Sequence, residues 1–510
     1  MRCAGGFASA NKLCKIMADL QNSLEIYCIV KQIFISMLGI RTKNKIYCSY
    51  IEKLLSKFGS IQKIQLICNT IYNNRKMNTL VELSIKDFKA IKRADVQLDG
   101  ITVVSGVNGC GKSTMSKLLY YIFRNANSFE ELVLLYTNSQ IRPYLNVLEQ
   151  IQSLLLYRRD TSSYRRLYFR NIELTSLEST HSFLDLVKDL CARFLNLESD
   201  LQKAGNSIIT ERLRLILRST LKSGEDRDTK KMLDALVGRI SEHLTKAEQL
   251  NVERPYRLLK ESLNAAFDVN LSKSIVLKEY GDAILGENLS NVPLLHYIKK
   301  VAYIDTPMVI GMETSSQQPI YWKELNLLLK QPPRRGYKRT INNIIKEDII
   351  KGDVSFDEDG FSAGFKYKRE DGKEFDLLEC ATGIKSFSLL QLLLKNLFLD
   401  ESTLLIIDEP EAHLHPQWIV EYARLIVLLH KKVGVKFFIA SHSTDMVSAI
   451  RYIAEEEKCL SSLSFYVAEN EEQKSNAFVF RPLGHDIEPI FESFNKSFER
   501  LDYYVSKKKK

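Results

Sequence analysis

The chain has 510 residues, enough for more than one hydrophobic core, and 45% of them are hydrophobic while 26% are charged. This composition is typical of a globular protein and argues against wholesale disorder. The most apolar stretch, residues 24–40, includes Glu25 and Lys31, so no membrane-spanning helix is expected. The nine cysteines form no CxxC pair, which fits reduced thiols in the cytoplasm better than disulfides or a zinc site.

The net charge of +10 is concentrated at the start of the chain. Residues 1–76 hold 12 Lys and Arg against 3 Asp and Glu, and five of the nine cysteines. Two interpretations compete. The segment is a basic helical extension, as the helical spacing between Ile51 and Phe58 indicates, or it is upstream sequence joined to a chain that begins at Met77. The second is favoured because the motif-bearing part of the chain starts directly afterwards.

Short strands and one long helical region follow in chain order. Residues 81–85 and 94–98 alternate, and the apolar residues 101–104 lead through a glycine-rich loop into an apolar helix, Met115 to Phe123. Residues 126–292 are rich in Leu, Glu, Lys and Arg and predict a helical insertion. Sustained heptads are absent, so a long coiled coil is not expected.

The second half of the chain returns to strands. Val301 to Asp305 predicts a strand, Asp353 to Leu378 predicts hairpins with turns at Asp359-Gly360 and Asp371-Gly372, and Ser386 to Leu399 predicts a helix. Residues 404–407 are apolar throughout and residues 436–439 nearly so, apart from Lys436, as buried parallel strands are. The predicted segments are 1–76, 77–125, 126–292, 293–480 and 481–510.

The glycine-rich loop matches the phosphate-binding pattern G-x-x-x-x-G-K-[ST]. Glycines let successive N–H groups turn toward phosphate oxygens, and the following helix adds its positive end. Lys112 is expected to reach the β- and γ-phosphates of ATP, Ser113 to bind Mg²⁺, and Thr114 to reach the α-phosphate. An ordinary glycine turn is the alternative, and the flanking strand and helix argue against it. The candidate nucleotide-binding residues are Gly106, Asn108, Gly109, Cys110, Gly111, Lys112, Ser113 and Thr114.

Polar residues follow two of the buried strands. Asp408 and Glu409 end the apolar run 404–407, where Asp408 is expected to hold Mg²⁺ and Glu409 to act as base for the attacking water. His442 follows the second run and is expected to sense the γ-phosphate. A solvated acidic turn and a structural histidine are the alternatives. A phosphate-binding loop in the same chain favours the catalytic interpretation.

These segments resemble the bacterial ABC/SMC-like AAA proteins, a group that includes OLD-type, Septu-type and AbiEii-like ATPases. The resemblance rests on GVNGCGKST, on LLIIDEPEAHLHP ending at Pro416, and on IASHST ending at Thr444. It covers about 80–123 and 301–448. It implies an α/β P-loop NTPase head that dimerises around two ATP molecules. The helical insertion predicted from composition would then lie between the phosphate-binding loop and a signature segment.

The signature segment of that group corresponds to residues 380–386 here. Ala381 replaces the serine expected to contact the γ-phosphate of the partner's ATP, while Thr382 offers a hydroxyl and Gly383 is retained. The resemblance implies that Thr382 and Gly383 bind nucleotide across a dimer. The departure at Ala381 bears on how strongly ATP drives dimerisation.

Further roles also come from the resemblance. Lys112, Glu409 and His442 form the implied catalytic set, and Gln140 is the candidate for the glutamine that links Mg²⁺ to the insertion. The loop with Glu411, His413 and His415 faces the dimer partner; its i,i+2 histidines without thiols make a poor zinc site.

The function expected is an ATPase whose ATP-driven homodimerisation controls a separate effector protein, in antiviral defence or DNA maintenance. A nucleotide-gated switch with negligible turnover is the alternative, and an ABC transporter subunit is a third. A GTPase is not expected, because the sequence has no evident N-K-x-D motif for reading the guanine base. Residues 443–510 are too few for the Toprim nuclease of OLD-type enzymes, so DNA cleavage is not expected.

Two basic-aromatic stretches offer contacts to nucleic acid, at residues 157–170 and 330–339. Solvated helix and loop surfaces are the alternative. The near-neutral charge of the chain after residue 76 favours that alternative.

Overall fold

The computed structural model of the protein describes residues 80–156, 173–203, 208–221, 228–268, 271–310, 318–358, 364–412, 414–470 and 477–492. The chain divides into two compact units, Met1–Asn78 and Thr79–Lys510, and every described residue belongs to the second. The N-terminal segment 1–76 lies outside the described residues, so both interpretations of it stay predictions.

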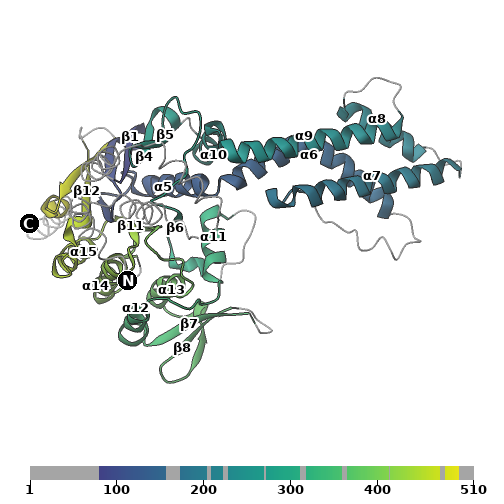
Figure 1. Cartoon of the computed structure of the whole chain (residues 1–510). Helices are drawn as coiled ribbons and strands as arrows, with labels where there is room; N and C mark the ends of the chain where they lie inside the picture. Colours follow the sequence, from purple (N-terminus) through teal and green to yellow (C-terminus); the bar gives the residue numbers. More distant parts are fainter. Residues whose placement is uncertain are drawn as a thin grey trace, which may run out of the picture. The chain divides into compact units, whose positions relative to one another are not determined.

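Within the described residues, ten strands form one mixed sheet (Figure 1). Their order across the sheet is β5-β4-β1-β2-β13-β12-β3-β11-β10-β6. Strands β12, β3, β11, β10 and β6 are successive parallel neighbours, whereas β1 pairs antiparallel with β2 and β4. The strands are β1 (Val81–Phe88), β2 (Ile91–Gln97), β3 (Ile101–Ser105), β4 (Ile275–Glu279), β5 (Asp282–Leu285), β6 (Lys300–Ile304), β10 (Thr403–Asp408), β11 (Lys436–Ser441), β12 (Leu463–Asn470) and β13 (Phe478–Gly484).

Helices cover both faces of the parallel part of the sheet. On one face α5 (Lys112–Asn127) packs against residues such as Ile406, while α13 (Thr382–Lys395), α14 (Pro416–Val433) and α15 (Thr444–Glu456) pack on the other face against residues such as Ile407. Strands β10 and β11 are buried over their whole length because both of their faces are covered. This layered arrangement confirms the predicted α/β P-loop NTPase fold.

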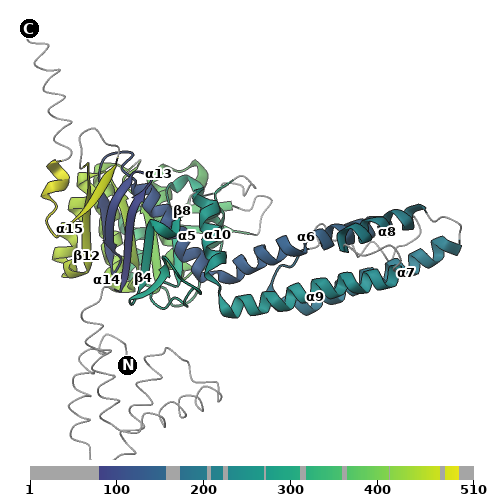
Figure 2. The same cartoon turned by 90° about the horizontal axis from the view of Figure 1, so that it is seen from above.

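The helical insertion forms an arm beside the sheet, visible in Figures 1 and 2. It has a separate core that includes Ile141, Val187 and Leu236. Phe129 of α6 and Leu250 of α9 instead belong to the core beneath the sheet, so these two helices join the arm to the head. The helices of the arm and its root are α6 (Phe129–Leu156), α7 (Thr180–Lys203), α8 (Ile208–Leu221), α9 (Thr229–Glu253) and α10 (Tyr256–Phe267).

The predicted helical range extended too far toward residue 292. Strands β4 and β5 occupy part of it, and β4 pairs with β1, as in the register of Leu277 with Leu83. The alternation of buried and exposed residues in β4, with Ile275 and Leu277 buried, is the strand pattern that the Leu- and Lys-rich composition concealed.

A small sheet extends from the signature side of the head. It consists of β7 (Gly352–Asp357), β8 (Gly364–Arg369) and β9 (Glu374–Asp376), and β7 contacts α13. Helices α11 (Ile320–Leu329) and α12 (Arg339–Asn343) precede it in the chain. The predicted turn at Asp371-Gly372 is present, since Gly372 has φ +81° and donates its N–H to the Arg369 carbonyl at 3.0 Å. The other predicted turn, at residues 359–360, lies outside the described residues.

Candidate nucleotide-binding site

The glycine-rich loop joins the end of β3 to the start of α5. Gly111 has φ +105°, and a Cβ there would lie 2.6 Å from Cγ1 of Ile91, so both backbone and space require glycine. Lys112 is buried, and its ammonium donates hydrogen bonds to the carbonyl oxygens of Gly106 (2.7 Å) and Val107 (3.0 Å). The loop therefore holds a cation beside the positive end of α5, an arrangement that favours anion binding.

The other residues of the loop differ in exposure. Asn108, Gly109 and Ser113 are exposed, and Thr114 is partly buried. Cys110 is fully buried, and burial raises the pKa of its thiol. The neutral sulfur therefore serves as a packing atom inside the loop.

Parallel pairing brings the predicted polar residues to one edge of the sheet. Ser441 at the end of β11 lies opposite Ser105 at the end of β3, and Asp408 at the end of β10 lies opposite Ala440. The carboxyl ends of these strands face the same way. The glycine loop, the acidic pair and the histidine segment consequently meet at this edge, which is where open α/β sheets bind their ligands.

Asp408 is a buried acid at this edge. It accepts a hydrogen bond from the phenol of Tyr303 on β6 at 3.0 Å, and the nearby Ser113 hydroxyl lowers the pKa of its carboxyl. Burial nevertheless raises the pKa of its carboxyl, and the nearby Glu409 charge acts in the same direction. Its other oxygen, Oδ1, is buried and has no hydrogen-bond partner among the described residues. A buried carboxylate oxygen beside a serine hydroxyl is the hard donor set that Mg²⁺ prefers, so these residues fit the ion.

Glu409 occupies an uncommon backbone conformation. Its φ is +51°, in the left-handed region that non-glycine residues seldom adopt, and its N–H donates to the Ala440 carbonyl at 2.7 Å. The side chain is 43% exposed, and Oε1 lies 3.5 Å from Nδ1 of His442, which is equally exposed. Two predicted catalytic side chains are thus adjacent at the mouth of the site, where strain of this kind is often retained for function.

The structure separates Gln140 from this site. Gln140 is an exposed residue of α6, and its amide contacts the Ser139 hydroxyl. It lies roughly 16 Å along the helix from Phe129 and follows the part of α6 that packs on the head. Its neighbour Ile141 belongs to the core of the arm. Among the described residues Gln140 has no contact with Asp408, and its role as the link between the metal and the insertion stays a prediction.

Thr382 and Gly383 lie at the start of α13, on the face of the sheet opposite α5. A Cβ at Gly383 would come within 2.3 Å of the Trp418 ring, so the glycine lets α14 approach the helix start. Ala381 precedes the helix and is exposed, and it offers no side-chain cap. Nucleotide binding by Thr382 and Gly383 across a dimer stays a prediction.

Two residues that the sequence reading did not assign also belong to the site. Tyr303 supports Asp408, and Asp305 directly follows β6 beside β10, where Ile304 pairs with Ile407. Burial raises the pKa of the Asp305 carboxyl, which accepts a 2.7 Å hydrogen bond from the Trp322 indole. The signal for Asp305 was present, because an acid ends the run 301–305 as Asp408 ends the next strand. Nothing in the sequence marks Tyr303.

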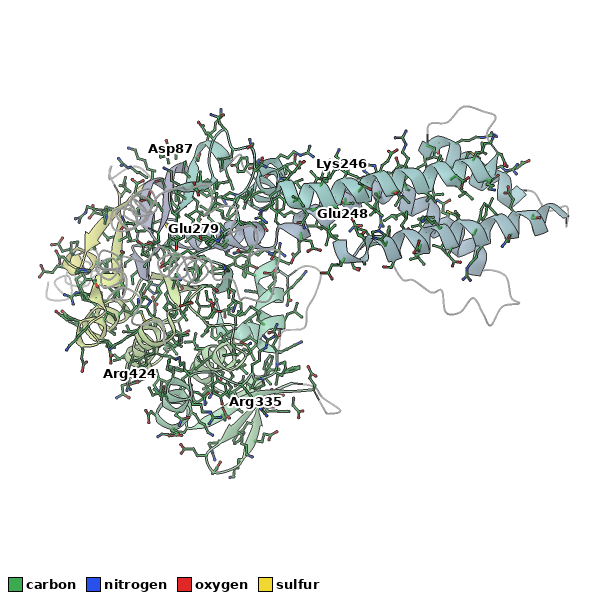
Figure 3. All side chains as sticks on the ribbon, in the orientation of Figure 1. Asp87, Lys246, Glu248, Glu279, Arg335 and Arg424 are labelled. Atoms are coloured by element: carbon green, nitrogen blue, oxygen red, sulfur yellow. The ribbon has the colours of Figure 1, made fainter. Side chains whose placement is uncertain are left out.

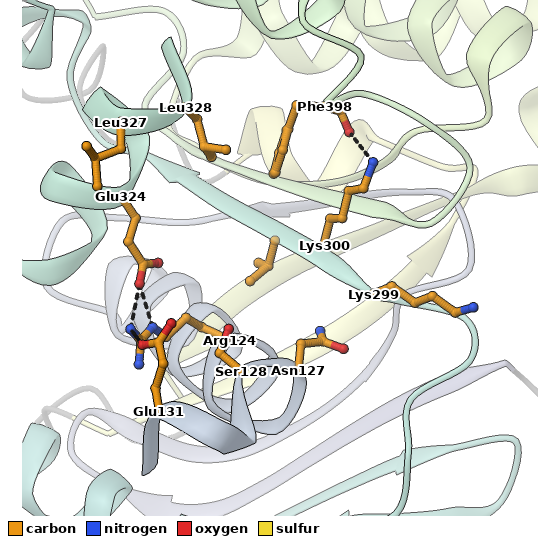
Figure 4. A pocket seen from close by; sticks show the side chains of 11 residues that line it. Arg124, Asn127, Ser128, Glu131, Lys299, Lys300, Glu324, Leu327, Leu328 and Phe398 are labelled. Carbon is orange, nitrogen blue, oxygen red and sulfur yellow. Dashed lines mark hydrogen bonds and ion pairs between the residues drawn. The ribbon is translucent and has the colours of Figure 1, made fainter. Parts of the chain in front are cut away.

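A cavity of about 330 Å³ lies elsewhere, at the root of the arm (Figure 4). Arg124 near the end of α5 bonds Glu324 of α11 at 2.7 Å and also pairs with Glu131 of α6. The cavity includes Lys300, at the start of β6, whereas the glycine loop and acids lie at the strand ends. It is therefore separate from the candidate nucleotide site.

Only one of the two basic-aromatic stretches can be placed. Arg334 and Arg335 are exposed, and Arg335 is labelled in Figure 3. Lys330 lies over the Phe356 ring of β7 at 5.6 Å. Residues 157–170 and His413 lie outside the described residues. Within those that are described, no group of His, Cys, Asp and Glu has the make-up of a metal site, and no helix is long and apolar enough to cross a membrane.

Two family matches cover the head and the arm. The family described as "AAA ATPase domain" matches residues 79–277, and the family described as "AAA domain, putative AbiEii toxin, Type IV TA system" matches residues 275–448. The chain carries AAA ATPase domains over residues 79–448. The resemblance seen in the sequence motifs is confirmed, and both matches include segments of the site. For an AAA protein of this kind, nucleotide binding is the shared property of the domain.

Solved structures are similar at low identity. An SMC head domain from Pyrococcus furiosus, bound to the C-terminal domain of ScpA, is 11% identical, with 82% of this chain and 98% of that chain covered and a TM-score of 0.30. The SMC head domain from Thermotoga maritima is 10% identical, with 79% and 98% covered and a TM-score of 0.33. No curated protein matches the chain. Because these TM-scores are low, the family is judged from the two sequence-family matches and not from the solved structures.

Proposed function

We propose that this AAA protein binds ATP with Mg²⁺ and hydrolyses it to ADP and phosphate. Lys112 and the loop N–H groups bind the phosphates, while Ser113 and Asp408 hold the ion. Glu409 takes the proton of the attacking water, and His442 contacts the γ-phosphate. When bound, Mg²⁺ supplies positive charge that stabilises the developing negative charge on the phosphate oxygens.

The observation that carries this proposal is the meeting of Ser113 and Asp408. These residues come from distant segments of the chain, yet the Ser113 hydroxyl and the Lys112 ammonium both lie close enough to the Asp408 carboxyl to lower its pKa. A buried carboxyl with a raised pKa is costly to maintain unless the site uses it. Glu409 and His442 lie 3.5 Å apart beside it, which supports hydrolysis as well as binding.

ATP-driven homodimerisation is the second part of the proposal. In the ATP state, the nucleotide of one subunit would lie against Thr382 and Gly383 of the other, and their position on the face opposite α5 fits contact in trans. Closing and reopening of the dimer would control a separate effector protein in the cytoplasm. Antiviral defence or DNA maintenance as the setting rests on the family alone.

A nucleotide-gated switch with negligible turnover is the second candidate. Ala381 favours it, because the exposed start of α13 lacks the serine hydroxyl that would contact the γ-phosphate. The presence of both Asp408 and Glu409 favours hydrolysis. A transporter subunit is less well supported, and nucleic-acid binding has only the exposed Arg334 and Arg335 in its favour.

Calorimetric titration of the full-length protein with ATP and Mg²⁺, alongside phosphate release, tests the proposal. Lys112→Ala should abolish binding, whereas Lys231→Ala, which removes an exposed lysine of α9, should bind as the native chain does. Tight ATP binding by Lys112→Ala would refute the site assignment. Binding without turnover in the native chain would favour the switch.

A further inference from the structure

Glu411 is a buried carboxylate that the catalytic scheme above does not use. Its side chain is only 6% exposed, although it follows the exposed Glu409 by two residues. The Ala412 N–H donates to the Glu409 carbonyl at 2.9 Å, and the Leu414 N–H donates to the Glu411 carbonyl at 3.1 Å. These successive turns direct the side chain inward, so it is unavailable to the dimer partner that the sequence assigned to this loop.

The inward carboxylate contacts the end of β11 and the residue that follows it. Its Oε1 accepts hydrogen bonds from the Ser441 hydroxyl and from the backbone N–H of His442, each at 2.9 Å. The same oxygen lies 3.2 Å from Nδ1 of the His442 ring. Glu411 therefore contacts both the backbone and the ring of His442.

This contact determines where the ring carries its proton. Nδ1 of His442 has two carboxylate oxygens nearby, from Glu411 at 3.2 Å and Glu409 at 3.5 Å. Among the described residues, neither this nitrogen nor the second Glu411 oxygen has a well-aligned hydrogen bond. A bare nitrogen lone pair facing a buried carboxylate is repulsive, whereas an N–H facing it is attractive. The proton is therefore favoured on Nδ1, which leaves Nε2 as the nitrogen available to a phosphate.

We propose that Glu411 is a positioning residue that fixes the orientation of His442 and keeps a proton on Nδ1, so that Nε2 is the nitrogen presented to the nucleotide. The catalytic part of this inference rests on the proposed function of His442 at the ATP site. The structural part, the location of the proton, does not. Carboxylates that hold metal-bound histidines commonly contribute 10- to 100-fold to metal affinity or activity, and we expect an effect of similar size for a carboxylate that holds a phosphate-contacting histidine.

The first test is nitrogen NMR of the full-length protein labelled at the histidine ring, with His442 assigned from the spectrum of His442→Gln. The native chain should show a protonated Nδ1. Glu411→Gln should shift the proton toward Nε2, because the neutral amide keeps the acceptor for Ser441 but loses the charge. Glu409→Gln, which leaves Glu411 in place, should retain the protonated Nδ1. A bare Nδ1 in the native spectrum overturns the proposal even if the variants do not fold.

The second test is steady-state turnover. Glu411→Gln should lower kcat 10- to 100-fold with KM for ATP changed less than threefold, while Glu421→Gln on the exposed side of α14 should leave both unchanged. In a His442→Gln background, Glu411→Gln should cost less than twofold, because its target is gone. A full additional loss there would overturn the positioning role. If the native chain does not turn over ATP, only the ATPase proposal is refuted. The location of the proton on Nδ1 is still decided by the NMR spectrum.

Discussion

Replacing Tyr303 by phenylalanine tests how the head supports its metal-binding acid. The substitution removes one hydroxyl from a fully buried ring, and that hydroxyl donates to Asp408 at 3.0 Å. A hydrogen bond to a charged group contributes about 1.5–3 kcal/mol. The second carboxylate oxygen of Asp408, Oδ1, has no hydrogen-bond donor among the described residues, so no nearby donor is available to replace the Tyr303 hydroxyl. We expect a loss of stability of this size at pH 8, where the carboxyl is ionised.

The pH dependence distinguishes this mechanism from loss of packing. The Tyr303 hydroxyl stabilises the ionised form of Asp408, so its contribution is present above the raised pKa of that carboxyl and declines as the pH falls through it. Thermal unfolding of native and Tyr303→Phe protein at pH 8 and pH 5 measures the difference. Tyr422→Phe, at a likewise buried tyrosine of α14, provides the control and should show no such pH dependence.

Turnover provides a second measure of the same change. Since Tyr303 orients a proposed metal ligand, its loss should reduce kcat about tenfold at saturating ATP and Mg²⁺. Equal destabilisation at both pH values together with unchanged kcat would refute the reasoning, because the hydroxyl would then only fill space.

Three further predictions follow from the same geometry. Asp408→Asn should raise the free energy of unfolding at pH 8 by about 1 kcal/mol, seen as a higher unfolding midpoint, because it removes a buried charge. The gain should shrink toward pH 4, since a raised carboxyl pKa destabilises the fold only as the pH rises through it. Gly111→Ala should weaken ATP binding in calorimetry far more than Gly109→Ala, because both have positive φ but only Gly111 lacks space for a Cβ. Gly383→Ala should abolish ATP-dependent dimerisation in a light-scattering assay without weakening ATP binding, because the added methyl would displace Trp418 from the start of α13.

The core of the site could be predicted because its signals are local in sequence. A glycine pattern between a strand and a helix determines how Lys112 is presented, and apolar runs that end in Asp408 or before His442 mark parallel strands. Once those strands are neighbours, their ends must meet. The roles that depend on a partner subunit, those of Thr382 and Gly383, stay predictions.

The parts that could not be predicted depend on contacts between distant segments. Tyr303 reaches Asp408 only because β6 pairs with β10, and Glu411 turns inward only because of turns that no spacing rule announces. Gln140 was placed by its order in the chain, but the direction in which α6 leaves the head decides its location. Composition favoured a helix at residues 275–279, but β4 forms there because pairing with β1 outweighs the weak local preference.

The most direct test of the account is the mass of the full-length protein with ATP and Mg²⁺, measured by light scattering for the native chain and for Glu409→Gln. If Glu409 drives hydrolysis and ATP drives closure, the native chain turns over ATP and returns to a monomer, whereas Glu409→Gln retains ATP and stays a dimer. If Glu409→Gln hydrolyses ATP at the native rate, or if neither protein changes mass with ATP, the proposed mechanism is contradicted.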